Sequence, residues 1–135
     1  MKAVLRLFYV LAGIGSLANG AWMLWSPSSW YTDLPAAVPD TGAFNSHFIR
    51  DIGVTYIVMA MGFAWCALRL DRCRPVHVGL TLLLGGHALL HLVDITTGRL
   101  PSSHWMIDAP VVFVPALVLA VLAAPAIWRQ TGAST

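Results

Sequence analysis

Long apolar stretches alternate with short polar breaks along this chain. A helix needs about 20 largely apolar residues to cross the hydrocarbon core of a bilayer. Four windows meet this requirement, and we predict membrane-spanning helices at residues 3–25, 48–70, 76–96 and 109–128. The longest break, residues 26–47, is rich in Pro, Ser, Asp and aromatic residues, which indicates an ordered, turn-rich loop. The pattern predicts one all-α domain over residues 1–135, a four-transmembrane-helix bundle.

The basic residues are unevenly divided between the two predicted sides of the membrane. Only Arg50 and Arg99 fall on the side of the long first loop. The other side carries Lys2, Arg6, Arg69, Arg72, Arg74 and Arg129. Because cytoplasmic segments of membrane proteins carry the excess of Lys and Arg, both termini are predicted to be cytoplasmic. We therefore expect a multi-pass protein of the bacterial inner (plasma) membrane, with residues 26–47 in the periplasm.

Composition supports the bilayer as the main partner of the chain. Hydrophobic residues make up 58% and charged residues 10%, whereas soluble domains carry roughly 25% charged residues. The net charge of +2, without a basic run interleaved with aromatic residues, argues against nucleic-acid binding. Cys66 and Cys73 fall near the predicted cytoplasmic end of the second helix, so we expect free thiols.

Small residues and prolines predict how the helices pack. Ala12, Ser16 and Gly20 recur every four residues, so one face of the first helix admits a close neighbour. Pro115 and Pro125 are predicted to bend the fourth helix locally. His77, beside Arg74 and Pro75, is predicted to lie at the cytoplasmic interface.

Eight polar side chains fall at or near the predicted external face: His47, Arg50, Asp51, His87, His91, Asp94, His104 and Asp108. His87, His91 and Asp94 have i, i+4, i+7 spacing, so they form a stripe along one side of the third helix. Burial of such groups in lipid is expensive, so we expect them to face the bundle interior and to pair. Arg50 is the expected partner of Asp51, Asp94 or Asp108.

This cluster suggests a transition-metal site. Neutral imidazole and carboxylate are good ligands for zinc, copper or iron. Two histidines at i, i+4 can hold one metal when a third ligand comes from another helix. The candidate ligands are His47, His87, His91, Asp94, His104 and Asp108, with Arg50 and Asp51 as a ligand-binding or ion-pairing group. By itself the H-x-x-x-H spacing is weak evidence for a metal site. It becomes stronger because the other candidate ligands are predicted to lie at the same end of the bundle.

Other interpretations of the cluster stay open. It is equally a structural polar network that fixes how the helices meet. Haem b would need axial histidines from two helices, such as His47 with His87 or His91. A metal-free pocket lined by His, Asp and Arg would bind a small anion or a lipid-like molecule, or act in acid/base chemistry, with the first loop as a cover.

The two main interpretations of the cluster, a ligand site or a structural network, lead to two hypotheses about function. One hypothesis is a small membrane protein with a periplasm-facing His/Asp/Arg site for a metal or small ligand. The alternative is a non-catalytic accessory subunit or assembly factor of a larger respiratory or redox membrane complex, with protein partners or a homo-oligomeric state. The sequence does not select a reaction, and whether the chain is an enzyme stays undecided.

The segment from Phe44 to Gly53, Phe-Asn-Ser-His-Phe-Ile-Arg-Asp-Ile-Gly, is the most distinctive in the chain. Together with the four-helix hydropathy, it resembles small bacterial inner-membrane proteins whose general plan is similar to that of the DoxX-like families. Those families share an Arg-x-x-Gly type of step in a transmembrane helix, and Arg50 to Gly53 is similar to it. The resemblance implies the four-helix architecture and, for some relatives, sulfur- or quinone-linked redox roles. The chain has no cofactor motif to match those roles.

Overall fold

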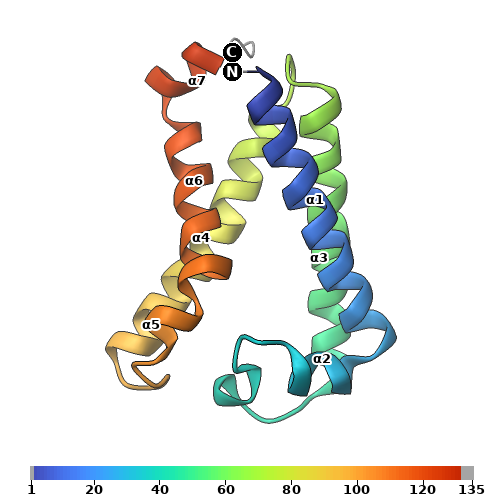
Figure 1. Cartoon of the computed structure of the whole chain (residues 1–135), viewed down its shortest axis with the longest axis vertical. Coiled ribbons are helices and arrows are strands. Elements are labelled where there is room, and N and C mark those ends of the chain that lie inside the picture. The colour runs from blue at the N-terminus through green and yellow to red at the C-terminus, as the bar shows by residue number, and fades with distance from the viewer. Residues whose placement is uncertain (1, 132–135) are drawn as a thin grey trace.

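The computed structural model describes residues 2–131, and this part of the chain forms helices and turns without a strand. Three long helices are apolar enough to cross a membrane: α1 (Lys2–Trp25), α3 (Ser46–Leu68) and α4 (Arg74–Thr96). The first loop contains α2 (Pro27–Asp33) and the 3-10 turn η1 (Val38–Thr41). After α4 come α5 (His104–Ile107), the π-helical turn η2 (Ala109–Phe113), α6 (Val114–Ala123) and α7 (Pro125–Thr131) (Figure 1).

The first three predicted helices are confirmed to within two residues at each end. Local chemistry fixes where α3 begins, because the side-chain oxygen of Asn45 accepts a hydrogen bond of 3.1 Å from the backbone N–H of Phe48. This is N-capping, which satisfies a donor that has no partner within the helix. Pro75 lies in the first turn of α4, where its missing N–H removes no helical hydrogen bond.

The fourth predicted helix is present as shorter pieces, and its main break falls beside Pro125, where a local bend was predicted. Its first turn is the π-helical η2, and regular α-helix runs only from Val114 to Ala123. At Ala124 the backbone is extended, with φ −60° and ψ 129°, and α7 starts at Pro125. A residue before proline is driven out of the helical region by contact with the proline ring, which explains the break. The apolar helix Ala109–Ala123 is therefore shorter than the other three.

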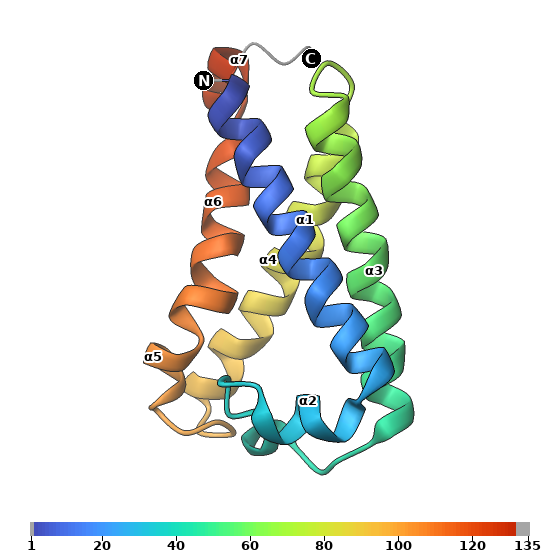
Figure 2. The same cartoon turned by 45° about the vertical axis from the view of Figure 1, so that its right-hand side comes forward.

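The two helices α1 and α3 approach closely along most of their length (Figures 1 and 2). Ser16 and Gly20 are buried in this contact, which confirms the small face predicted for the first helix. A Cβ atom added at Gly20 would lie 2.7 Å from the carbonyl oxygen of Gly53 on α3, so only glycine fits there. Such small contacts let two backbones come together where no side chain separates them.

The other pair, α4 and α6, diverges from α1 and α3 along the molecule. One end, here called the terminal end, holds the start of α1, the α3–α4 turn and α7. The opposite end, the loop end, holds α2, η1 and α5, and there the two pairs stand apart (Figures 1 and 2). The start of α1 and the end of α7 therefore lie at the same end of the molecule.

The core is concentrated at the terminal end, where Tyr9, Phe63, Leu119 and Trp128 are buried. His77, near the start of α4, lies inside this core with no exposed surface, a burial that the sequence did not indicate. The tautomer follows from its two contacts. Its Nε2–H donates to the carbonyl oxygen of Leu119 at 3.0 Å, and its Nδ1 accepts from the Tyr9 hydroxyl at 2.9 Å. The free thiols of Cys66 and Cys73 are buried beside this network.

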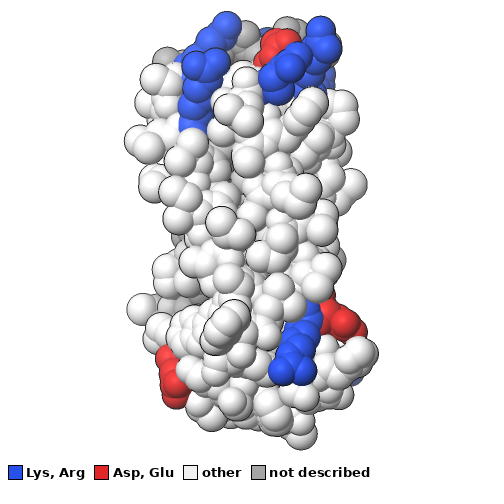
Figure 3. Space-filling view, turned by 90° about the vertical axis from the view of Figure 1, so that its right-hand side faces the viewer, with Lys and Arg blue, Asp and Glu red and all other residues white. Residues whose placement is uncertain are grey.

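The molecular surface is apolar along the middle of the long helices. Exposed side chains there include Leu11 and Ile14 on α1, Val58 on α3, and Leu82 and Leu89 on α4. Figure 3 shows charged side chains at both ends of one face, separated by a broad band that carries none. This distribution suits a helical membrane protein, whose middle faces hydrocarbon and whose ends face water.

Candidate metal centre

A group of two histidines and one aspartate lies at the loop end, between α4 and the segment before α6. His91 comes from the last third of α4, His104 opens α5, and Asp108 follows α5 directly. The backbone N–H of Asp108 donates to the carbonyl of His104 at 2.9 Å, so the chain stays helical between them. Residues four apart on a helical turn share a face, which brings both side chains toward α4.

The three side chains converge on one carboxylate oxygen. The Nδ1 atom of His91 lies 2.7 Å from Oδ2 of Asp108, and Nδ1 of His104 lies 3.1 Å from the same oxygen. One ligand atom from each residue lies within 4.8 Å of the others. The side chains of His104 and Asp108 are 0% and 2% exposed, and that of His91 is 15% exposed. His104 and Asp108 are thus shielded from solvent, and His91 is the most exposed of the three.

The first loop supplies a fourth residue that the sequence did not single out. The Oδ2 atom of Asp40 lies 3.2 Å from Nε2 of His104, on the opposite side of that ring from Asp108. Asp40 is in η1 and its side chain is 42% exposed, so it links the buried imidazole to the surface. From sequence, Pro39-Asp40-Thr41-Gly42 indicates only a turn, and nothing in it shows that the loop folds back onto a helix 64 positions later.

Side-chain hydrogen bonds hold this loop in place. The indole N–H of Trp30 on α2 donates to the side-chain oxygen of Asn19 on α1 at 2.8 Å. The Tyr31 hydroxyl donates to the carbonyl of Gly42 at 2.7 Å, which ties α2 to the end of η1. The Ser29 hydroxyl also donates to Asp33 at 2.7 Å, but this bond lies within α2; it lowers the pKa of the Asp33 carboxyl without linking α2 to η1. The position of Asp40 is therefore set by α1 and α2 as well as by His104.

The hydrogen bonds also constrain where the protons lie. Both nitrogens of His104 face a carboxylate, and a ring N–H donates to a carboxylate oxygen at each position where the nitrogen carries a proton. When a metal cation takes the Nδ1 position, that proton leaves, and the Nε2–H remains to donate to Asp40. A carboxylate behind a metal-binding histidine fixes the tautomer and the ring orientation in this way.

His87 lies one turn before His91 on α4. The two rings make an edge-to-face contact with their centroids 4.6 Å apart. His87 is exposed, and within residues 2–131 its ring takes part in no hydrogen bond. It therefore lies beside the metal-binding group without belonging to it.

The other predicted site residues lie outside the group. His47 and Asp51 form an exposed i, i+4 pair on α3 with a closest distance of 3.5 Å. Asp94 pairs with Arg99 at 3.2 Å, close to the end of α4. Arg50 is exposed and takes part in none of the ion pairs of the described chain, so the expected pairing with Asp51, Asp94 or Asp108 was wrong. The structure brings together three of the six predicted ligands, His91, His104 and Asp108.

The position of His47 also bears on haem b. The suggested axial pairs each used His47, whose side chain is 89% exposed and contacts Asp51. Two histidines remain together at the loop end, His91 and His104, and both direct Nδ1 at Asp108. This arrangement resembles a compact ligand set for a single small cation.

Comparison with known proteins adds no family to this description. No protein-family model, curated protein or solved structure matches the chain.

Proposed function

We propose that this chain is a four-span bacterial inner-membrane protein that binds one divalent transition-metal ion at its periplasmic end. His91, His104 and Asp108 are the protein ligands, and Asp40 orients His104 from the first loop. The observation that carries the proposal is the convergence of two imidazole nitrogens and one carboxylate oxygen within 4.8 Å in a buried position.

The donor set indicates the class of metal. Two imidazoles and one carboxylate suit zinc, copper or iron, whereas calcium and magnesium prefer sites built from oxygen alone. Three protein ligands leave at least one coordination position for water or a substrate, as in catalytic zinc sites. His91 is the partly exposed ligand, so the open position would face the space between the helix pairs rather than α5.

The topology supports a periplasmic position for this site. α1 begins and α7 ends at the terminal end, where six of the eight Lys and Arg residues lie by sequence. The positive-inside rule assigns that end to the cytoplasm. The loop end, with Asp40 and His104, is then on the periplasmic side.

Elemental analysis of purified protein tests the proposal. Protein prepared in a mild detergent is loaded with Zn²⁺ or Co²⁺, desalted and assayed for metal per chain. The wild type should retain about one ion, and His91→Ala, His104→Ala and Asp108→Asn should each lose it because three ligands are the minimum for a tight site. His47→Ala is the matched control, since it removes a loop-end histidine that lies outside the group. It should retain the ion.

The Co²⁺-loaded protein adds a readout of geometry. Cobalt bound by two nitrogens and one or two oxygens should show visible absorption bands that disappear in His104→Ala and persist in His47→Ala. Wild type that holds no metal after loading, or a His47→Ala variant that loses as much as His104→Ala, would contradict the proposal. The cluster would then be a structural network of hydrogen bonds.

A further inference from the structure

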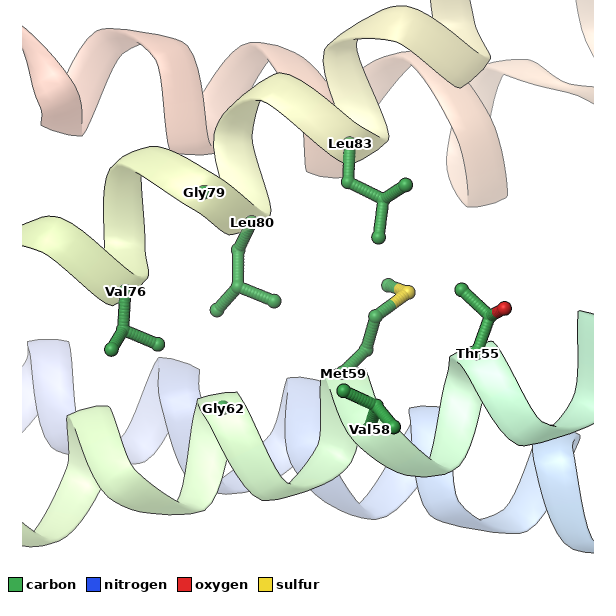
Figure 4. A pocket seen from close by; sticks show the side chains of 8 residues that line it. All are labelled: Thr55, Val58, Met59, Gly62, Val76, Gly79, Leu80 and Leu83. Carbon is green, nitrogen blue, oxygen red and sulfur yellow. The ribbon is translucent and has the colours of Figure 1, made fainter.

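An apolar groove runs between α3 and α4 in the middle of the molecule (Figure 4). Its volume is about 280 Å³. Thr55, Val58, Met59 and Gly62 form one wall, and Val76, Gly79, Leu80 and Leu83 form the other. No charged residue lines it. In Figure 4 the walls are closest at Val76 and Gly62 and separate toward Leu83 and Thr55, which is the direction of the loop end.

His87 continues the α4 wall of this groove. At about 100° per residue, its side chain projects about 20° from Val76 and about 20° from Leu80 around the helix axis, between these two groove residues. It lies one turn beyond Leu83, so it stands where the groove opens. It is also nine residues before the end of α4, which places it about 14 Å from that end of the helix, within the apolar span.

The imidazole of His87 has no hydrogen-bond partner within the described chain, whereas the three other histidines that lie in its buried or half-buried parts each have one. His91 and His104 contact Asp108, and His77 contacts Tyr9 and Leu119. A polar group inside a membrane span is costly unless a partner satisfies it. His87 is therefore a hydrogen-bonding group that faces an apolar groove and needs a partner from outside the protein.

We propose that this groove binds a single-chain lipid alcohol, with its hydrocarbon chain against Gly62, Gly79 and Leu80 and its hydroxyl at His87. The narrow volume and the two glycines suit one chain rather than the two chains of a phospholipid. A Cβ atom added at Gly79 would meet nothing within 4 Å, so the space beside it is open.

A neutral hydroxyl fits the polar end of the groove better than an anion. Two carboxylates lie beyond the groove. Asp51 is one turn beyond Thr55 on α3, and Asp108 is bonded to His91, the imidazole that contacts His87. These carboxylates would repel a phosphate or a fatty-acid carboxylate. A hydroxyl donates and accepts, so it can pair with the His87 ring in either tautomer. The Thr55 hydroxyl already donates to the Asp51 carbonyl at 3.2 Å, and its oxygen can still accept.

Photolabelling in lipid nanodiscs tests the proposal. The probe is hexadecanol carrying a diazirine in its chain, and the labelled residues are found by mass spectrometry. Labels should fall in the α3 segment 55–62 and the α4 segment 76–83. Gly79→Phe should remove most of the labelling because the ring fills the groove. Gly15→Phe is the matched control, since Gly15 is also a helical glycine with open space at its Cβ position but does not line the groove.

Competition in the wild type tests the role of His87 without relying on a variant. Unlabelled hexadecanol should compete at an about three- to tenfold lower concentration than hexadecane, which is the range expected from one hydrogen bond. Palmitate should compete no better than hexadecane. In His87→Ala the advantage of the alcohol over the alkane should disappear.

Several outcomes would overturn the proposal. Equal competition by alcohol and alkane would show a groove filled by bulk lipid chains. Stronger competition by palmitate would show an anion site. Loss of labelling on dimer formation, measured by mass photometry, would show a second copy as the occupant. The labelling is measured in metal-free protein, so its result does not depend on whether the proposed metal site binds an ion.

Discussion

The Nδ1 atom of His91 lies 2.7 Å from the Oδ2 atom of Asp108, which joins α4 to the segment between α5 and η2 at the loop end. The same carboxylate oxygen contacts His104 at 3.1 Å, so one aspartate serves two imidazoles. α4 and α6 also pack against each other, whereas α4 and α1 stand apart at the loop end. Asp108 is therefore structural as well as a proposed ligand.

Asp108→Asn should destabilise the metal-free protein. The amide oxygen can take the place of Oδ2, but it carries no negative charge, so the hydrogen bonds from both imidazoles become weaker. This costs about 1–3 kcal/mol. Unfolding in increasing SDS, followed by tryptophan fluorescence, measures the change. Asp94→Asn is the matched control: its partner Arg99 is largely exposed, so the loss should stay below about 1 kcal/mol. Equal losses in the two variants would contradict a buried role for Asp108.

Asp40→Asn should weaken metal binding while leaving the ligands in place. The carboxylate of Asp40 stabilises the Nε2–H of His104 and so directs the lone pair of Nδ1 toward the metal. Removal of such a partner typically lowers affinity about 10- to 100-fold. Competition for Zn²⁺ with a fluorescent chelator measures it. Asp33→Asn changes an aspartate of the same loop that contacts Ser29 and Thr32 instead, and its affinity should stay at the wild-type value.

Gly20→Ala should destabilise the contact between α1 and α3. The added Cβ would lie 2.7 Å from the Gly53 carbonyl oxygen and 3.0 Å from Cβ of Tyr56, and the helices would have to separate. Overpacking of this kind costs about 1–3 kcal/mol. Gly15→Ala, where the added Cβ meets nothing within 4 Å, should be neutral or slightly stabilising. SDS unfolding of both variants separates a steric effect from helix propensity.

The orientation in the membrane can be tested by labelling introduced cysteines in intact cells. Ala43→Cys in the exposed first loop should react with a membrane-impermeant maleimide, and Asp71→Cys in the α3–α4 turn should react only after lysis. The native thiols give little background, because Cys66 and Cys73 are buried and burial raises the pKa of Cys73. The opposite labelling pattern would place the metal site in the cytoplasm.

Hydropathy predicted the long helices well because an apolar stretch of about 20 residues has few other stable forms. For the last apolar stretch it gave one helix with local bends at its prolines, whereas the structure interrupts the helix completely before Pro125, with apolar residues on both sides of the break. The small face of α1 was predicted correctly because a four-residue repeat is a local property. The burial of His77 was not predicted, since it depends on Tyr9 and Leu119 from two other helices.

For the candidate site too, local patterns could be predicted from the sequence, whereas contacts between separate elements could not. The i, i+4 pair of His104 and Asp108 and the position of His91 near one end of its helix follow from the sequence. The rotation of each helix about its axis decides which side chains face one another. As a result Asp94 pairs with Arg99 rather than joining His91, and His47 lies on the surface. Asp40 could not be found, because its role comes from the path of a loop. The resemblance to DoxX-like families stays a prediction.

The contact between Asp40 and His104 joins a segment made early in synthesis to one made 64 residues later. Chains are synthesised from the N-terminus, so α1, the first loop and α3 can insert and pair before α5 exists. The proposed metal site cannot form until α5 has been made and has come to lie beside the loop. A bound ion would thus mark a chain whose insertion is complete, and a protein truncated after α4 should pair α1 with α3 normally while binding no metal.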